Sequence, residues 1–366
     1  MGLQSDAVED RAPCIIVIAS TTKRGNGEVT RRSATTRNGW PPCRLAAAFG
    51  LTIGLLTSQG LAEDAEDARP PDRVSFYFAA HEDDWQLFMN PSAFMDVADS
   101  KTKTVFIHVT AGDAGVGMGK RGRKHPYYRA RENGAEIAIR FMADAGEQPV
   151  EKVTSRMELN EHRIHRVAYR TTVTYFLRLP DGHPAGLGFP GTGYQSLERL
   201  AKGKIKTMSA IDRSTTYHGW PDLVSTFKAI VDHERGQAGA VQLNVPEANE
   251  TINPGDHSDH RMTAKAALDA AQDLACARRV YYVDYASRIL PENLTGQPRD
   301  MESSVLAVTA AGILALDHAS VWHPYHRSYL GRNYFRIEEG VGPCNAPVAD
   351  KGRTVSAQPI NATGRQ

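Results

Sequence analysis

The sequence predicts an α/β protein with a mostly parallel sheet flanked by helices. Two short runs of β-branched and aromatic residues, 73–79 and 103–110, each end at a polar loop, as buried strands do. Helical stretches follow them at 91–98 and at 127–145, where apolar residues recur every three to four positions. Strands that alternate with helices in this way form parallel βαβ units.

The same alternation returns in the second half of the chain. The predicted elements are a helix at 221–234, a strand at 238–245, a helix at 258–278, a strand at 279–285 and a last apolar helix at 301–318. We therefore expect one domain over 73–290, followed by a C-terminal helix and tail at 291–366 that pack on this domain or trail from it.

The segment from about 156 to 216 interrupts the pattern. Residues 162–179 alternate well enough to form two strands, 181–193 is a loop rich in Gly and Pro, and 196–201 predicts a short helix. We interpret the whole segment as an insertion on one rim of the domain.

The beginning of the chain has the features of an export signal. An uncharged run at 45–61 follows scattered arginines, ends at Gly60-Leu61-Ala62 and precedes a group of acidic residues. We interpret 1–62 as an extension plus a signal peptide cleaved after Ala62, and 63–72 as a linker. The alternatives are an uncleaved membrane anchor and a buried helix. After cleavage, we expect a periplasmic or secreted protein with no membrane partner.

Charge and cysteine content narrow the class of partner and the compartment. The chain carries 43 basic and 42 acidic side chains, so it has no overall charge that would favour a nucleic acid or an anionic membrane. Small molecules or neutral polymers are the expected partners. Of the cysteines, only Cys276 and Cys344 follow the predicted cleavage point, and they either pair in an oxidising compartment or stay as two buried thiols.

Polar clusters follow two of the predicted strands. One is His81-Glu82-Asp83-Asp84, and the other is Asp256-His257-Ser258-Asp259-His260 at the start of a helix. Ligands bind at the carboxyl ends of strands in open α/β sheets. Two imidazoles and one carboxylate suit a catalytic zinc ion that keeps a position open for water, and the same set suits Fe(II). The simpler alternative is that the histidines cap helices and the aspartates solvate loops.

These motifs resemble those of the PIG-L/LmbE-like de-N-acetylases. Ala80-His81-Glu82-Asp83-Asp84 is similar to the Ala-His-Pro-Asp-Asp signature of that family, and His257-Ser258-Asp259-His260 is similar to its His-Pro-Asp-His motif. Thr110-Ala111-Gly112-Asp113 is similar to a Thr-x-Gly-Asp/Glu turn, and Arg129-Ala-Arg-Glu132 to an Arg-x-x-Glu helix start. The resemblance covers roughly residues 73–290, with the motifs in the same order.

The resemblance implies a Rossmann-like, zinc-dependent hydrolase that removes acetyl from an N-acetylglucosamine-type sugar in a glycan or glycoconjugate. It implies that His81, Asp84 and His260 bind the metal, that Asp83 is the general base, and that His257, when protonated, stabilises the oxyanion. This agrees with amide chemistry, because a bound zinc ion lowers the pKa of its water and a nearby carboxylate can accept the proton.

Other residues are weaker candidates for substrate contacts. Trp85 replaces the glutamate that commonly follows the two aspartates, and it can wall the pocket. Arg129 and Asp113 can contact the substrate, although a salt bridge and a solvated turn are their simpler interpretations. The segment His323-Pro-Tyr-His326 can be a second metal pair or a sugar-stacking platform, but ordinary packing over the core is the favoured interpretation.

Two other functions remain open from the sequence. One is hydrolysis of a different amide or ester at the same site. The other is a non-catalytic glycan-binding protein whose metal is structural. Asp83 and His257 favour an enzyme, because a structural metal needs neither a free base nor an oxyanion donor.

Overall fold

The computed structural model of the chain describes residues 70–119 and 124–345. The predicted extension and signal peptide at 1–62 lie outside these residues, as does most of the predicted linker at 63–72. Among the residues described, no helix is both long and apolar enough to cross a membrane.

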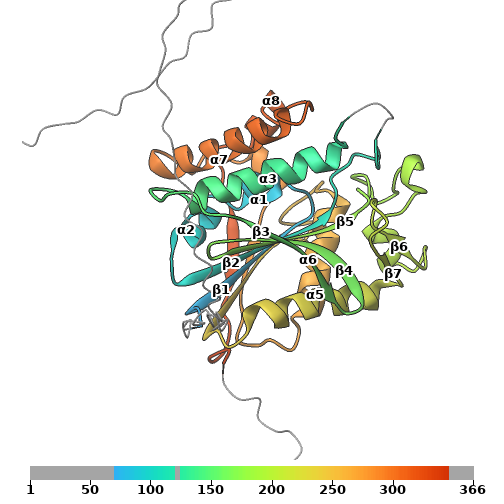
Figure 1. Cartoon of the computed structure of the whole chain (residues 1–366), viewed down its shortest axis with the longest axis horizontal. Coiled ribbons are helices and arrows are strands. Elements are labelled where there is room, and N and C mark those ends of the chain that lie inside the picture. Colours follow the sequence, from blue (N-terminus) through green and yellow to red (C-terminus); the bar gives the residue numbers. More distant parts are fainter. Residues whose placement is uncertain (1–69, 120–123, 346–366) are drawn as a thin grey trace, which may run out of the picture. The chain divides into compact units, whose positions relative to one another are not determined.

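An eight-stranded sheet forms the centre of the described protein (Figure 1). Its order is β10-β9-β8-β1-β2-β5-β4-β3, and the strands from β9 to β5 run parallel. β10 at one edge and β4 and β3 at the other add antiparallel pairs. The bounds are β1 Arg73–Ala79, β2 Thr102–Thr110, β3 Val153–Leu159, β4 His162–Tyr169, β5 Thr172–Leu179, β8 Ala240–Pro246, β9 Arg278–Tyr282 and β10 Phe335–Glu338. The predicted α/β class with a mostly parallel sheet is confirmed.

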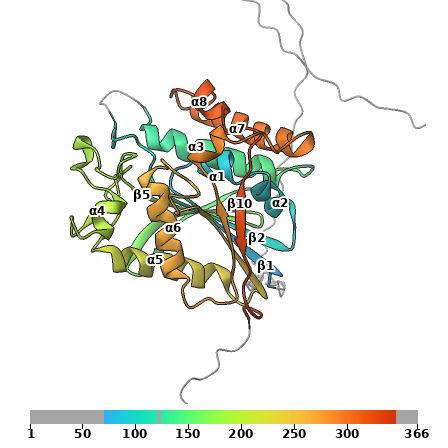
Figure 2. The same ribbon diagram turned by 180° about the vertical axis from the view of Figure 1, so that it is seen from behind.

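Helices cover both faces of the sheet (Figures 1 and 2). Helices α1, α2, α3 and α7 pack on one face, and α4, α5 and α6 pack on the other. In β1, Phe76 and Phe78 enter the core beneath α5 and α6, whereas Tyr77 and Ala79 enter the opposite core, as expected for a strand buried on both faces. The bounds are α1 Asp84–Phe88, α2 Ser92–Ala98, α3 Tyr127–Ala143, α4 Leu197–Ala201, α5 Trp220–Arg235, α6 Ser258–Ala270, α7 Gln297–Leu314 and α8 Pro324–Arg327.

Helices α3 and α7 approach each other closely through two glycines. A Cβ on Gly134 would lie 2.7 Å from the carbonyl oxygen of Thr309, and a Cβ on Gly312 would lie 2.8 Å from the Cα of Gly134. Side chains larger than hydrogen would therefore push the helices apart. This contact ties the C-terminal part of the chain to the helix that carries Arg131.

The segment predicted as an insertion is built into the central sheet. β5 pairs in parallel with β2, and only β4 and β3 extend the sheet beyond it. β3 and β10 were not predicted, because both are edge strands with mostly exposed residues and little apolar pattern. The helix expected over 258–278 ends at Ala270, and residues 271–277 form a turn that leads into β9.

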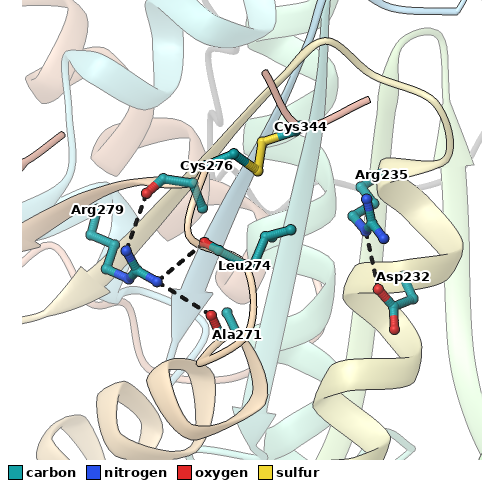
Figure 3. Close-up of a disulfide and its surroundings, with 8 residues drawn as sticks. Asp232, Arg235, Ala271, Leu274, Cys276, Arg279 and Cys344 are labelled. Atoms are coloured by element: carbon teal, nitrogen blue, oxygen red, sulfur yellow. Dashed lines mark hydrogen bonds and ion pairs between the residues drawn. A yellow bond between two sulfur atoms is a disulfide. The ribbon is translucent and has the colours of Figure 1, made fainter. Parts of the chain in front are cut away.

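A disulfide links Cys276 to Cys344, so the first of the two sequence alternatives holds (Figure 3). It joins the turn before β9 to the residues that follow β10. In the same turn, the Arg279 guanidinium donates to the carbonyl oxygens of Ala271, Leu274 and Ala277. The turn after α6 is thus held by a covalent bond and by one cation.

Candidate metal centre

His81 and Asp84 are brought together by the turn that follows β1. His81 lies just beyond the carboxyl end of this strand, and Asp84 is the first residue of α1. The backbone N–H of His81 donates to Asp84 Oδ2 at 2.7 Å, which fixes the carboxylate beside the ring. Asp84 Oδ1 lies 3.4 Å from His81 Nδ1, so both atoms can contact one cation.

His260 reaches the same point from α6, the helix that follows β8. Because β8 and β1 are neighbouring parallel strands, their carboxyl ends lie at the same edge of the sheet. His260 Nε2 lies 3.3 Å from Asp84 Oδ1. Donor atoms about 2.0–2.2 Å from a tetrahedral zinc ion lie roughly 3.3–3.6 Å from one another, so both measured separations fit such an ion.

A buried nitrogen that lacks a partner also indicates a cation. His260 is fully buried, and within the described chain its Nε2 has no hydrogen-bond partner. Burial of a polar atom without a hydrogen-bond partner costs free energy, and a bond to a metal would offset this cost. His81, Asp84 and His260 form a cluster that could hold a metal ion, and this donor set suits zinc and Fe(II) alike.

Further carboxylates surround the two histidines. Asp256 Oδ1 lies 2.8 Å and Asp284 Oδ2 3.1 Å from His260 Nδ1, and Asp259 Oδ2 lies 3.5 Å from His81 Nε2. Such outer partners fix the orientation of a ligating ring and make it a better ligand. With Asp181 and His257 they also form two overlapping clusters that share His81 or His260 with the first.

The charges of the cluster favour a bound cation. Burial alone would lower the pKa of His81 and of His260, but the carboxylates around them raise both pKa values well above the usual range. Burial opposes ionisation of Asp84, yet the two imidazoles lower its pKa well below the usual range. Burial also raises the pKa of Asp284 to about 8. A divalent ion that binds here would therefore displace protons from the cluster.

A cavity of about 230 Å³ opens beside the cluster. Its polar wall includes His81, Asp83, Asp84, Arg131, Asp181 and His257. Its lining also includes five aromatic residues, Phe88, Phe189, Tyr285, Tyr325 and Tyr329. A concave site with a mostly apolar lining and a few convergent polar groups is typical of small-molecule binding.

Asp83 lies in this cavity next to the cluster, where its carboxylate has two neighbours. Oδ1 forms an ion pair with the Arg131 guanidinium, which also lies 3.0 Å from Glu82. Oδ2 lies 3.9 Å from His326 Nε2. One oxygen is thus anchored to α3, and the other remains on the cavity side.

His257 is fixed as a donor toward the cavity. Its Nδ1 accepts the backbone N–H of Asp259 at 3.1 Å, so the ring hydrogen of the neutral form lies on Nε2. Burial and the nearby rings of His81 and His260 lower the pKa of His257 far below its usual range. This shift favours the neutral imidazole over the protonated form that the sequence predicts, and the neutral ring still offers the Nε2–H.

Of the weaker sequence candidates, Tyr325 and His326 line the cavity, whereas Trp85, Arg129 and Asp113 do not. Trp85 is fully buried and donates from Nε1 to His108 at 3.1 Å, so the expectation that it walls the pocket is wrong. Arg129 makes the simpler contact, an ion pair of 2.5 Å with Glu132. Asp113 is fully buried and accepts the backbone N–H of Asp181 at 2.9 Å, so it holds a cavity loop and is not a solvated turn residue.

Several cavity and cluster residues were absent from the sequence candidates. Asp284 follows β9, and its position after a third parallel strand is a signal that could have revealed it. Arg131 stands two residues from Arg129 on α3, and only the helix orientation decides which of them faces the cavity. Asp181 follows β5 and Tyr285 follows β9, and neither carries a local pattern, whereas Tyr325 on α8 belongs to the segment that the sequence marked as an alternative stacking platform.

The fold and this cluster define an α/β protein with a candidate metal centre at the carboxyl edge of its sheet. No protein-family model matches the chain, and a search of curated proteins finds no match.

Proposed function

We propose that this protein is an exported, zinc-dependent de-N-acetylase of the PIG-L/LmbE-like type, with a Rossmann-like core. Its substrate would be an N-acetylglucosamine-type sugar in a glycan or glycoconjugate. The observation that carries the proposal is the arrangement of five side chains. The cluster of His81, Asp84 and His260 lies beside the Asp83 carboxylate, whose Oδ2 is not bound by Arg131, and beside the Nε2–H of His257. All five side chains are the ones that the motif resemblance marks.

The zinc ion, held by His81, Asp84 and His260, would supply Lewis acidity and lower the pKa of a water molecule in the cavity. Asp83 would accept a proton from the attacking water through Oδ2, while Arg131 holds its other oxygen in place. His257 would donate its Nε2–H to the oxygen that gains charge as the carbonyl becomes tetrahedral. A single donor of this kind is worth about 2.7–4 kcal/mol in the transition state.

The cavity also suits a sugar. Tyr285, Tyr325 and Tyr329 line the cavity, and their rings present apolar faces next to polar hydroxyl groups. Tyr325 is 41% exposed, so one part of its ring is open to a ligand at the rim. Such a wall fits a ring that is apolar on its faces and hydroxylated at its edge.

An enzyme is favoured over a structural metal site by the position of the cluster. Three protein ligands leave a fourth position for water, whereas structural zinc sites are closed by four protein ligands. Two of the three cluster residues, His81 and Asp84, also line the cavity, so a ligand in the cavity can reach the metal position.

The test is acetate release from N-acetylated saccharides by purified residues 63–366, with and without added zinc. We expect release that chelation abolishes and zinc restores. An Asp83→Asn variant should keep its zinc and lose activity, with Asp212→Asn, which does not line the cavity, as a control. Release of other acyl groups but not of acetate would favour a different amide or ester hydrolase. Tight glycan binding without turnover in the zinc-loaded protein would favour a binding protein.

A further inference from the structure

We propose that His326 is a catalytic residue that donates the proton to the departing amine. This inference rests on the proposed amide hydrolysis and adds a residue from outside the segment that carries the motifs. His326 lines the cavity from α8, and its Nε2 lies 3.9 Å from Asp83 Oδ2. The imidazole and the carboxylate therefore border the same part of the cavity, where both can reach one amide group.

The ring orientation of His326 is set by a backbone hydrogen bond. Its Nδ1 lies 3.0 Å from the carbonyl oxygen of Val321, and a carbonyl oxygen can only accept, so Nδ1 carries a hydrogen. Nε2 is then the atom that gains or loses the second proton, and it is the atom that faces Asp83. A proton donor needs this kind of fixed geometry.

The segment around α8 is anchored to the core on both sides of the histidine. Val321 before the helix and Tyr329 and Leu330 after it are buried in the same apolar cluster as α7. The side-chain amide of Asn333 donates to the carbonyl oxygen of Phe88 at 2.8 Å, which ties the chain after α8 directly to α1. His326 therefore belongs to a packed wall of the cavity.

Charged and aromatic groups face His326 from several elements. Asp83 faces it from the turn before α1, and Arg131 on α3 is bound to the other oxygen of that carboxylate. On its own segment, the rings of His323 and Tyr325 lie 4.3 Å and 5.6 Å away between centroids. Its side chain is 20% exposed, so exchange of protons with solvent is open.

Hydrolysis of the amide would move two protons through Asp83 and His326. Water adds to the amide carbon, a C–O bond forms, and Asp83 receives one proton of the water. The C–N bond then breaks, and the proton on His326 Nε2 moves to the nitrogen, which leaves as an amine together with the carboxylic acid. Transfer of the proton held by Asp83 to His326 Nε2 restores both groups.

The test compares two substrates in His326→Gln, His326→Ala and the matched control His323→Gln. An amide nitrogen needs a proton to leave, whereas the phenolate of 4-nitrophenyl acetate does not. We expect the His326 variants to lose about 10²–10⁴-fold in kcat on the N-acetylated sugar and to lose far less on the activated ester. His323→Gln should keep both rates. Added imidazole should restore part of the amidase activity of His326→Ala, and the alkaline limb of the wild-type pH profile should be absent in His326→Gln.

Zinc content and thermal unfolding of each variant show whether it is folded. Equal losses on both substrates in a folded, zinc-loaded His326 variant would mean that the residue only shapes the wall, and unchanged amidase activity would also overturn the inference. A wild-type protein that hydrolyses neither substrate would instead refute the proposed function itself. The two failures are therefore distinguishable.

Discussion

His260 Nε2 lies 3.3 Å from Asp84 Oδ1, although the two residues belong to helices that follow different strands. The pairing depends on β1 and β8 being neighbours, because only then do the turns after both strands meet at one edge of the sheet. The cluster is therefore as much a property of the strand order as of the motifs.

The ligand cluster predicts a graded loss of zinc affinity. Asp84→Ala or His260→Ala should abolish stoichiometric zinc binding, because each removes one of three ligands. Above pH 8, where the Asp284 carboxyl is ionised, Asp284→Asn should weaken binding about 10–100-fold, since it removes the charge behind His260 and keeps the shape of the side chain. Isothermal titration calorimetry of the metal-free protein with zinc checks this order. Asp284→Asn binding as tightly as wild type would contradict a supporting role for that carboxylate.

Zinc binding should release protons and weaken as pH falls. In the metal-free protein the carboxylates raise the pKa values of His81 and His260, so both rings hold protons that must leave before zinc can bind. The number of protons released follows from titrations at one pH in buffers with different ionisation enthalpies. An affinity that does not change between pH 6 and pH 8 would contradict this linkage.

Arg131 and Arg129 should differ strongly although they are neighbours on α3. Arg131 is buried between Glu82 and Asp83, and its loss would leave two buried carboxylates without a cation. Removal of one partner from such a buried pair costs about 3–5 kcal/mol. The Arg129 side chain is 41% exposed and its partner Glu132 keeps an ion pair with Arg178, so Arg129→Ala should cost at most about 1 kcal/mol. Urea denaturation of Arg131→Ala and Arg129→Ala measures both costs, and equal values would contradict the assignment.

The disulfide should contribute to stability from outside the candidate metal centre. The bond between Cys276 and Cys344 closes a long loop that includes β9, α7 and α8. Its removal in Cys276→Ser/Cys344→Ser should lower the free energy of unfolding by about 2–4 kcal/mol. Urea denaturation with and without a reductant checks this value. The reductant should shift the wild type and leave the double variant unchanged.

Much of the fold follows from local patterns. The parallel strands were predicted because they are buried on both faces, which produces continuous apolar runs such as Val74–Ala79. Edge strands such as β3 and β10 lack that signal, since solvent covers part of each of them. The role of β5 was also missed, because nothing in its residues shows that it pairs with β2 and not only with β4.

Some residues of the candidate site could likewise be predicted from local patterns, and others could not. His81, Asp84 and His260 were predicted because each follows a strand and belongs to a recognisable motif. Arg131 and His326 enter the cavity through the orientation of α3 and the packing of the C-terminal segment, which are tertiary properties. Trp85 is the opposite case. Its place in a motif predicted that it lines the pocket, but its side chain is buried in the core, where it donates to His108.

Glu302 on α7 should make the C-terminal wall sensitive to high pH. Burial raises its pKa to about 8, and its Oε2 accepts the backbone N–H of Gly331 at 2.6 Å, just after the α8 segment. Because the folded pKa lies above the unfolded one, near 4.5, the folded state binds the extra proton, and stability falls as pH rises from about 4.5 to 8. Glu302→Gln keeps the acceptor and removes the charge. Its stability relative to wild type should therefore rise between pH 5 and pH 9 in urea denaturation, by on the order of 1 kcal/mol or more. Parallel pH dependences of the two proteins would show that the carboxyl group is not protonated in the folded state.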